Sequence, residues 1–372
     1  MKRFFVPKRK LDVHVALSTA LLVTIAELVS TQRTMAQTIA YTVVELGVVD
    51  AGQVSCRINN LGDLVGRSGR SGVGETRATV WSHGNLQPKH LGALPGGEYS
   101  SASAINDAGE VAGASNTGNA IVPFIWKPTG GLHRVSLLPG DNCGQGFGLN
   151  KYGHLVGYSS GPNGARAFLW AASTGARNLG SLPGGNYSRA RQVNDSDEVV
   201  GTSASPAGDR AVLWTKTGQV RDLGTLSGDT SSQAMAINNA GDVVGYSKGP
   251  GGLRAFLWTQ ATGMQDLGVL PGGNSSRAFD INDLGYVVGS STSSSGDDHA
   301  FIWTKQTGLT DLNSAASAGL GVVFMEANAI NSTGEIVVMG KATSEGGIIL
   351  PEHQDCAPAP PSTFLLIPAP AQ

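Results

Sequence analysis

The sequence is poor in the residues and motifs that characterise several common classes of protein. It has only three cysteines, Cys56, Cys143 and Cys356, which occupy unrelated positions, so no disulfide framework holds the chain together. One bridge at most can form, and the sequence leaves open which pair, if any, forms it. None of the three lies in a lipobox-like context, which argues against a lipid anchor.

Motifs of catalysis are equally scarce. The sequence contains no His-Glu-x-x-His metal motif, no Gly-x-Ser-x-Gly elbow and no Cys-His constellation. Its Gly-rich turns are predicted to join strand to strand, so they do not form a phosphate cradle before a helix. The sequence therefore predicts no metal, no cofactor and no assigned catalytic residue, and it leaves open whether the chain is an enzyme.

Basic residues are few outside the N-terminus. Residues 1–36 hold six of the 26 Lys and Arg residues and two of the 28 Asp and Glu residues, which leaves 20 basic and 26 acidic residues beyond them. The remaining chain thus carries a formal charge of −6. Nucleic acids require a basic binding surface, so we predict no nucleic-acid partner.

The first 36 residues have the pattern of an export signal. Basic residues, from Lys2 to Lys10, precede an apolar run over 13–29, and Thr34 and Ala36 supply the small residues of a cleavage site. We predict a signal peptide over 1–36 and a secreted or periplasmic mature protein. An uncleaved anchor is the alternative, but Glu27 interrupts the run, and ~20 apolar residues are needed to span a membrane. No later run approaches that length.

The rest of the sequence is dominated by an internal repeat of about 44 residues. Its clearest mark is an Asn that follows Ile, Leu or Val seven times, at Asn59, Asn106, Asn150, Asn194, Asn238, Asn282 and Asn331. A Gly stands three residues after six of them, and Asp197 takes that place in the fourth repeat. Asn closes turns on its own backbone, and Gly or Asp tolerates the left-handed region, so each motif predicts a tight β-hairpin.

A single Trp follows each of the first six Asn residues by 20 to 22 positions, at Trp81, Trp126, Trp170, Trp214, Trp258 and Trp303. Each ends an apolar strand such as Ala-Phe-Leu-Trp, which favours a packing role. The alternative, an aromatic platform for stacking sugars, would require exposed rings. A further strand of the Leu-Gly type then leads to a Pro-Gly-Gly turn in several repeats.

Four short strands per repeat, seven times over, predict an all-β fold, a seven-bladed β-propeller of four-stranded antiparallel blades over 37–350. Residues 41–49 match the fourth strand of a repeat, and the last repeat is predicted to take its third strand from 347–350 and then stop. We therefore expect the N-terminal strand to pair into the last blade, which removes both exposed edges. Residues 351–372 hold six of the 17 prolines and are predicted to be a disordered tail.

These motifs resemble the HAF family of extracellular repeat proteins. The resemblance rests on Ile-Asn-Asp/Asn-x-Gly-x-Val-Val-Gly, Ala-Phe-Leu-Trp-Thr and Asp-Leu-Gly-x-Leu-x-Gly, and it covers about 41–350. The His-Ala-Phe motif that names the family stands at His299, whereas Arg replaces this His in three other repeats. The resemblance implies export and carries over no catalytic residue.

One repeated position is a candidate ligand site, because the same place in five repeats holds a basic or imidazole side chain: Arg77, Arg166, Arg210, Arg254 and His299. Symmetry would arrange them in a ring that could bind carboxylate or phosphate. The alternative is that each packs its stem between blades and pairs with a neighbouring Asp or carbonyl.

Residues that depart from the repeat are a second kind of candidate, because a catalytic group needs one particular place. Arg191 and Asp280 lie on predicted innermost strands and would face the central funnel. We predict a monomeric, non-catalytic module that binds an extracellular protein, glycan or surface component through loops on one face. The alternative is a hydrolase or lyase that acts on a polysaccharide at the funnel.

Overall fold

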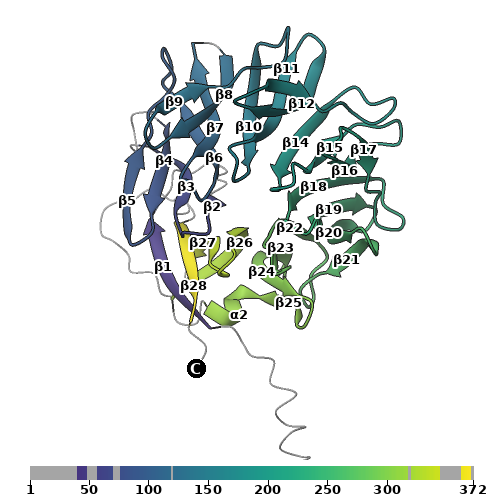
Figure 1. Cartoon of the computed structure of the whole chain (residues 1–372). Helices are drawn as coiled ribbons and strands as arrows, with labels where there is room; N and C mark the ends of the chain where they lie inside the picture. The colour runs from purple at the N-terminus through teal and green to yellow at the C-terminus, as the bar shows by residue number, and fades with distance from the viewer. Residues whose placement is uncertain are drawn as a thin grey trace, which may run out of the picture. The chain divides into compact units, whose positions relative to one another are not determined.

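The computed structural model describes residues 40–47, 57–69, 76–118, 120–316, 320–343 and 362–369. The predicted signal peptide, the strand expected at 347–350, Cys56 and Cys356 lie outside these ranges. The described residues fall within one compact unit, Ala40–Gln372. They form seven four-stranded antiparallel sheets arranged in a ring, so the predicted seven-bladed propeller is confirmed (Figure 1).

The first six blades each use four consecutive strands. Blades one and two hold β2 (Arg57–Ile58), β3 (Leu64–Gly69), β4 (Thr76–Ser82), β5 (Asn85–His90), β6 (Ser100–Ile105), β7 (Val111–Thr117), β8 (Ala120–Lys127) and β9 (Gly131–Arg134). Blades three and four hold β10 (Cys143–Leu149), β11 (Leu155–Gly161), β12 (Gly164–Ala171), β13 (Gly175–Asn178), β14 (Ser188–Val193), β15 (Val199–Ser203), β16 (Arg210–Trp214) and β17 (Val220–Asp222). Blades five and six hold β18 (Ser231–Ile237), β19 (Val243–Gly249), β20 (Gly252–Thr259), β21 (Gly263–Gly268), β22 (Ser276–Ile281), β23 (Val287–Thr292), β24 (Asp298–Thr304) and β25 (Gly308–Asp311), followed by the short helix α2 (Leu312–Ala316).

The seventh blade joins the two ends of the ring. Its strands are β26 (Val322–Ile330), β27 (Ile336–Ala342), β28 (Ser362–Pro368) and β1 (Tyr41–Gly47), in the order β26, β27, β28, β1. The N-terminal strand therefore completes the last blade, as predicted. It does so by pairing with a C-terminal strand, with Val44 opposite Leu365.

The prediction of a disordered tail over 351–372 is wrong for Ser362–Pro368, and the propeller extends beyond residue 350. The physical reason is the apolar run Phe364, Leu365 and Leu366, whose side chains are all buried. Their burial stabilises a strand that the nearby prolines do not interrupt, because Pro368 stands at its end.

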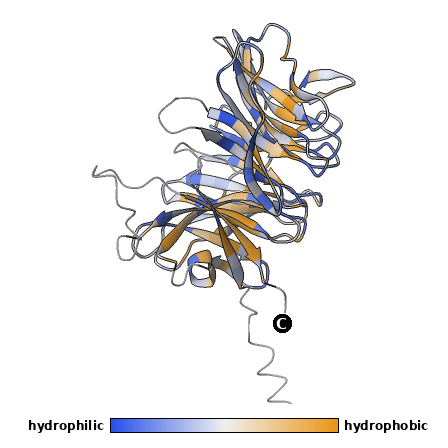
Figure 2. Cartoon of the chain, turned by 90° about the vertical axis from the view of Figure 1, so that its left-hand side faces the viewer, coloured by the Kyte–Doolittle hydropathy of each residue, from blue (hydrophilic) through white to orange (hydrophobic). Residues whose placement is uncertain are grey.

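The core consists of seven layers between neighbouring blades rather than one central cluster. One layer combines Val200 and Leu213 of blade four with Phe256 and Trp258 of blade five. The layer that closes the ring packs Trp81 of blade one against residues of blade seven, including Leu365. Figure 2 shows hydrophobic residues along the strands of the sheets. Because adjacent blades share each layer, the stability of every blade depends on its neighbours.

The Asn hairpins have the predicted geometry. In blade five, Asn238 Oδ1 accepts the backbone N–H groups of Ala240 and Asp242, at 3.1 and 2.9 Å. Gly241 has a φ of +83°, and Asp197 takes the same left-handed conformation in blade four with a φ of +62°. The seven repeated Asn residues surround a single pocket, so the hairpins that join first to second strands all lie at one end of the central channel. We call this end the Asn end.

Candidate functional site

An unbroken circle of hydrogen bonds runs around the Asn end and joins all seven blades. The side-chain amide of each repeated Asn donates to the backbone carbonyl of the corresponding Asn in the next blade, at 2.9 to 3.2 Å. The seventh bond runs from Asn331 back to Asn59 and so crosses the closure of the chain. All seven side chains are buried. We call this circle the Asn belt. The sequence predicted the hydrogen bonds of each Asn within its own turn, but not its bond to the next blade.

A second, incomplete circle of hydrogen bonds is formed by the residues that directly follow each repeated Asn. Backbone N–H groups of five blades donate to a side-chain oxygen in the next blade, as Asn239 does to Asp283 at 2.8 Å. No such bond is recorded to Lys151 or Ser332 in the described residues, and a Lys side chain has no acceptor. The Asn end thus owes its order to repeated residues that bond one another.

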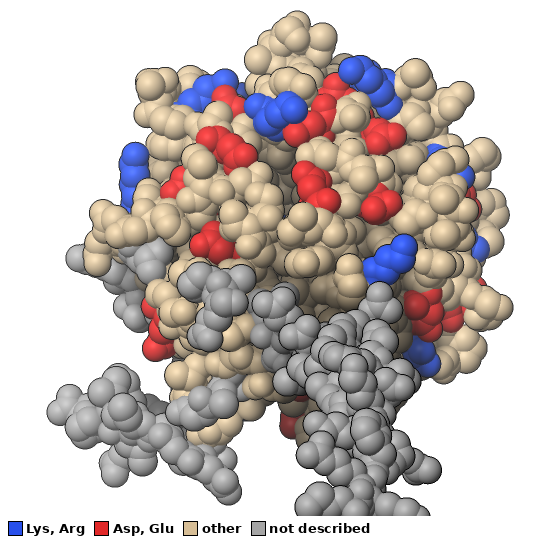
Figure 3. All heavy atoms as spheres, turned by 60° about the horizontal axis from the view of Figure 1, so that its bottom comes forward, with Lys and Arg blue, Asp and Glu red and all other residues tan. Residues whose placement is uncertain are grey.

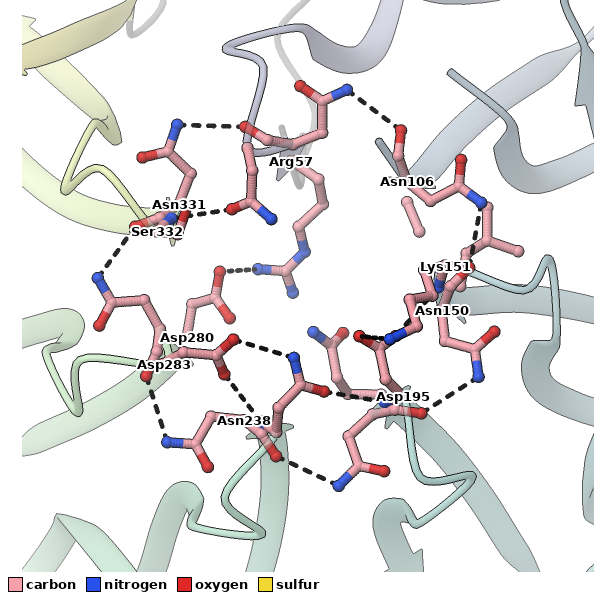
Figure 4. Close-up of a pocket in the computed structure, with 18 of the residues that line it drawn as sticks. Arg57, Asn106, Asn150, Lys151, Asp195, Asn238, Asp280, Asp283, Asn331 and Ser332 are labelled. Carbon is pink, nitrogen blue, oxygen red and sulfur yellow. Dashed lines mark hydrogen bonds and ion pairs between the residues drawn. The ribbon is translucent and has the colours of Figure 1, made fainter. Parts of the chain in front are cut away.

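Arg57 and Asp280 lie in the middle of the Asn end, in a pocket of about 190 Å³ (Figure 4). Asp280, which is 7% exposed, accepts the N–H groups of Ile281 and Ile330 at 3.0 and 3.1 Å. Its carboxylate lies 3.7 Å from the guanidinium of Arg57, which also donates to the carbonyl of Asn328 at 2.5 Å. Burial raises the pKa of Asp280, and Arg57 and the two N–H groups oppose that rise. Asp280 therefore links blades six, seven and one.

Between the two ends of the channel, the innermost strands hold residues that do not repeat. In blades two to six, the innermost strand contains a β-bulge three residues before the Asn, which falls at Ser103, Phe147, Arg191, Met235 and Phe279. These side chains are half-buried, whereas the Ala or Gly residues immediately before them are buried. A bulge redirects its side chain, and the residue type at this position changes among Ser, Phe, Arg and Met around the ring.

A cavity of about 410 Å³ opens at the opposite end of the channel, between blades three, four and five. We call it the arginine cavity, and it is lined by Ser160, Ala165, Tyr187, Arg189, Arg191, Thr202, Asp209 and Gln233. Tyr187 precedes β14, whose other end leads to Asn194, so the cavity lies away from the Asn belt. The two cavities therefore belong to opposite ends of the channel.

Aromatic rings of blade three carry the two arginines of the cavity. The guanidinium carbon of Arg189 lies 5.1 Å from the centroid of Tyr158, and that of Arg191 lies 4.9 Å from Phe147. The two rings pack against each other with centroids 5.9 Å apart. Burial is the main cause that lowers the pKa of Arg191; Tyr246 and Tyr158 oppose this shift, and the neighbouring charges of Arg189 and Arg57 add to it. Cation–π contacts hold the guanidinium planes without neutralising them.

The polar groups beside the arginines are partly engaged with one another. Tyr187 is hydrogen-bonded to Asp209, and burial, followed by that bond, raises the pKa of Tyr187 to about 12. Gln233 accepts the hydroxyl of Tyr246 at 2.9 Å, which leaves its amide N–H₂ group for other partners. The cavity thus offers a tyrosine, an amide and two hydroxyls around a pair of cations.

The predicted ring of Arg77, Arg166, Arg210, Arg254 and His299 occupies the third strands and lines neither cavity. Four of its members pair with an Asp of their own blade: Arg166 with Asp141, Arg210 with Asp222, Arg254 with Asp266 and His299 with Asp311. Arg77 donates to the carbonyl of Thr76 at 3.4 Å. This geometry matches the pairing alternative considered for these residues.

The six Trp residues pack between blades. Trp81, Trp214 and Trp258 are buried, and Trp126, Trp170 and Trp303 are half-buried against the core layers. No ring is exposed, so the geometry offers no sugar-stacking platform on these residues. Among the described cysteines, Cys143 is a free thiol.

Of the two predicted channel residues, Arg191 lines the arginine cavity and Asp280 lines the pocket at the Asn end, so the structure does not bring them together. Arg189 was missed. The usable signal was variation within the repeat, because Arg189 stands five residues before Asn194, at a position that holds Val, Ser, Gln, Arg or Glu in the other repeats. Charge on the surface is mixed, with acidic side chains across the middle of the face in Figure 3 and most basic ones nearer its edge.

Comparison with known proteins supports the fold and goes no further. No family model matches the chain, and no curated protein matches it. Among solved structures, a streptogramin B lyase is 10% identical with a TM-score of 0.53, covering 89% of this chain and 98% of that one. Virginiamycin B lyase from Staphylococcus aureus is also 10% identical with a TM-score of 0.53, covering 88% and 99%. No helix in the described residues is long and apolar enough to cross a membrane.

Proposed function

We propose that this chain is an exported, non-catalytic propeller that binds a partner, glycan or surface component at one face of the ring. The supporting observation is the arginine cavity, in which three neighbouring blades contribute side chains that the repeat does not demand. A cavity of about 410 Å³ falls within the roughly 300–1,000 Å³ that small-molecule sites occupy. The strands of the three blades, or the residues next to them, hold these side chains, which makes the site rigid.

Export and membership of the HAF family are part of this proposal. They rest on the N-terminal pattern over 1–36 and on the three repeated motifs. Expression of the full chain in a bacterium with a periplasm tests export. We expect a processed protein outside the cytoplasm that begins at Gln37, as read by intact mass. An unprocessed chain retained with the membrane would contradict the cleaved signal.

The experiment for binding is a glycan array with the purified mature protein, followed by hydrogen exchange on any complex. We expect a ligand that slows amide exchange at the starts of β14 and β18 and leaves the Asn end unchanged. Failure to bind any glycan on the array, together with an empty pull-down from the cell exterior, would contradict a binding role.

The alternative function is a hydrolase or lyase acting on a polysaccharide at the channel. The observation in its favour is Asp280, a buried carboxyl of raised pKa at the floor of a pocket. Its two backbone hydrogen bonds and its contact with Arg57 already account for its presence. Turnover of a polysaccharide by the purified protein, abolished in Asp280→Asn, would reverse the ranking.

A further inference from the structure

The arginine cavity contains two guanidinium groups that form no ion pair with any described residue. Neither Arg189 nor Arg191 has an ion pair or hydrogen bond within the described part of the chain, and their recorded contacts are the rings of Tyr158 and Phe147. Asp209, an acidic side chain in the cavity lining, is hydrogen-bonded to Tyr187 and forms no ion pair with Arg189 or Arg191. This contrasts with Arg166, Arg210 and Arg254, each of which has its own Asp.

Two like charges on one strand, two residues apart, repel each other, and burial of one of them adds to the cost. Arg191 is half-buried, and its guanidinium feels both Arg189 and Arg57. An anion placed between the two guanidinium groups would remove this repulsion. The ring contacts fix the planes of both groups, which leaves their N–H edges for bidentate bonds to a carboxylate or an ester oxyanion.

The rest of the lining is suited to sugar hydroxyls. Ser160 and Thr202 supply hydroxyl groups that donate and accept, and Gln233 supplies an amide. Apolar surface in the lining is limited to Ala165 and parts of longer side chains, which disfavours a hydrophobic ligand.

We infer that the arginine cavity binds an acidic sugar, with its carboxylate or sulfate held between Arg189 and Arg191 and its hydroxyls held by Gln233, Thr202 and Ser160. This inference rests on the proposed binding function and names its ligand class. It places the working face of the propeller at the end of the channel opposite the Asn belt.

Calorimetric titration of the mature protein with short oligogalacturonates, their methyl esters and a sulfated oligosaccharide tests the inference. The methyl esters keep the sugar and remove the charge, and the sulfated probe distinguishes the two kinds of anion. We expect the acidic probes to bind, the esters to bind at least about tenfold more weakly, and the affinity to fall as salt rises.

Arg191→Gln and Arg189→Gln should each weaken binding of the acidic probe by about tenfold to a hundredfold, since each removes a charge-assisted pair. Arg189 is exposed, so its variant should fold even if the Arg191 variant does not. Arg254→Gln is the matched control, because it removes a cation that already pairs with Asp266 at 3.1 Å.

The outcomes separate the two proposals. Esters that bind as tightly as the acids, with no effect of either variant, would overturn the acidic-sugar inference and leave the binding function standing. Equal loss in Arg254→Gln would also overturn it, by moving the ligand to the ring on the third strands. No binding of these probes, while the array finds a neutral ligand elsewhere, would overturn it as well. An array without any ligand would overturn the binding function itself.

Discussion

The two ends of the central channel differ in whether their side chains repeat from blade to blade. At the Asn end, the same side chain stands in all seven blades, is buried, and bonds to the same side chain next to it. At the arginine cavity, the lining side chains differ from blade to blade and include Arg189 and Arg191, which form no ion pair among the described residues.

This difference separates residues that hold the ring from residues that are available to act. A hydrogen bond made seven times around a circle stabilises closure, and each copy is satisfied by its neighbour. A side chain present once has no copy of itself in the next blade to bond: Arg57 and Asp280 contact each other, whereas Arg189 and Arg191 form no ion pair among the described residues. The repeated Arg and His residues of the third strands belong to the first group, because four of them already have an Asp.

The largest effect should follow from removal of β28, on which both ends depend. A chain that stops at residue 361 loses the buried Phe364, Leu365 and Leu366 and leaves β1 without its pairing strand. Deleting three such side chains costs about 2–5 kcal/mol each, comparable to the roughly 5–15 kcal/mol stability of a domain. We expect loss of cooperative unfolding by circular dichroism. A chain that stops at Ala369 is the control, and equal melting of both chains would contradict the closure.

Truncation of a core Trp should come next. Trp214 is 0% exposed, and its indole N–H donates to the carbonyl of Gly180 at 3.3 Å. Trp214→Ala should lower the free energy of unfolding by about 3–5 kcal/mol, measured by urea titration. The half-buried Trp303 is the internal comparison, and Trp303→Ala should cost less. A greater loss at Trp303 would contradict the packing described for the two rings.

A single change in the Asn belt should cost about 1–3 kcal/mol. Asn238→Asp keeps an acceptor for the N–H groups of Ala240 and Asp242 but loses the donor to the carbonyl of Asn282. It also sets two carboxylates together, because Asp242 lies 3.5 Å from the Asn238 amide. Asn239→Ala, in the exposed second circle, is the control and should cost less. Equal urea midpoints for both variants would contradict a stabilising role of the Asn belt.

The smallest effect concerns pH. Because burial raises the native pKa of Asp280 above its unfolded value, the protonated form is favoured in the folded protein, so this contribution to stability grows as pH falls and is lost as pH rises through the native pKa. The difference in unfolding free energy between the wild type and Asp280→Asn should therefore shift in favour of the wild type between pH 7 and pH 4.5. A constant difference would show that Asp280 titrates alike in both states.

The sequence predicted the blade number because each blade carries the same turn, and the turn chemistry of Asn and Gly is local. The last blade was harder to predict, because its third strand comes from Ser362–Pro368 after an intervening segment. The prolines around that strand favoured a prediction of disorder, although the segment contains an apolar run. Pairing between distant strands depends on tertiary packing, which local composition does not report.

The site was predicted in part, for a related reason. Arg191 departs visibly from the repeat, but its ring partner Phe147 lies in the preceding blade, and Arg189 matters only because it lines the same cavity as Arg191. The repeated Arg positions looked alike in sequence, yet pairing with Asp222 or Asp266 depends on register across strands. Contacts between strands thus decide which cations remain unpaired.

The most direct test of the contrast between the two ends is one calorimetric titration series, with the same oligogalacturonate added to Asn238→Asp and to Arg191→Gln. The account predicts that Asn238→Asp, although less stable, binds with the affinity of the wild type, whereas Arg191→Gln binds at least about tenfold more weakly. Weakened binding in Asn238→Asp with full affinity in Arg191→Gln would contradict it.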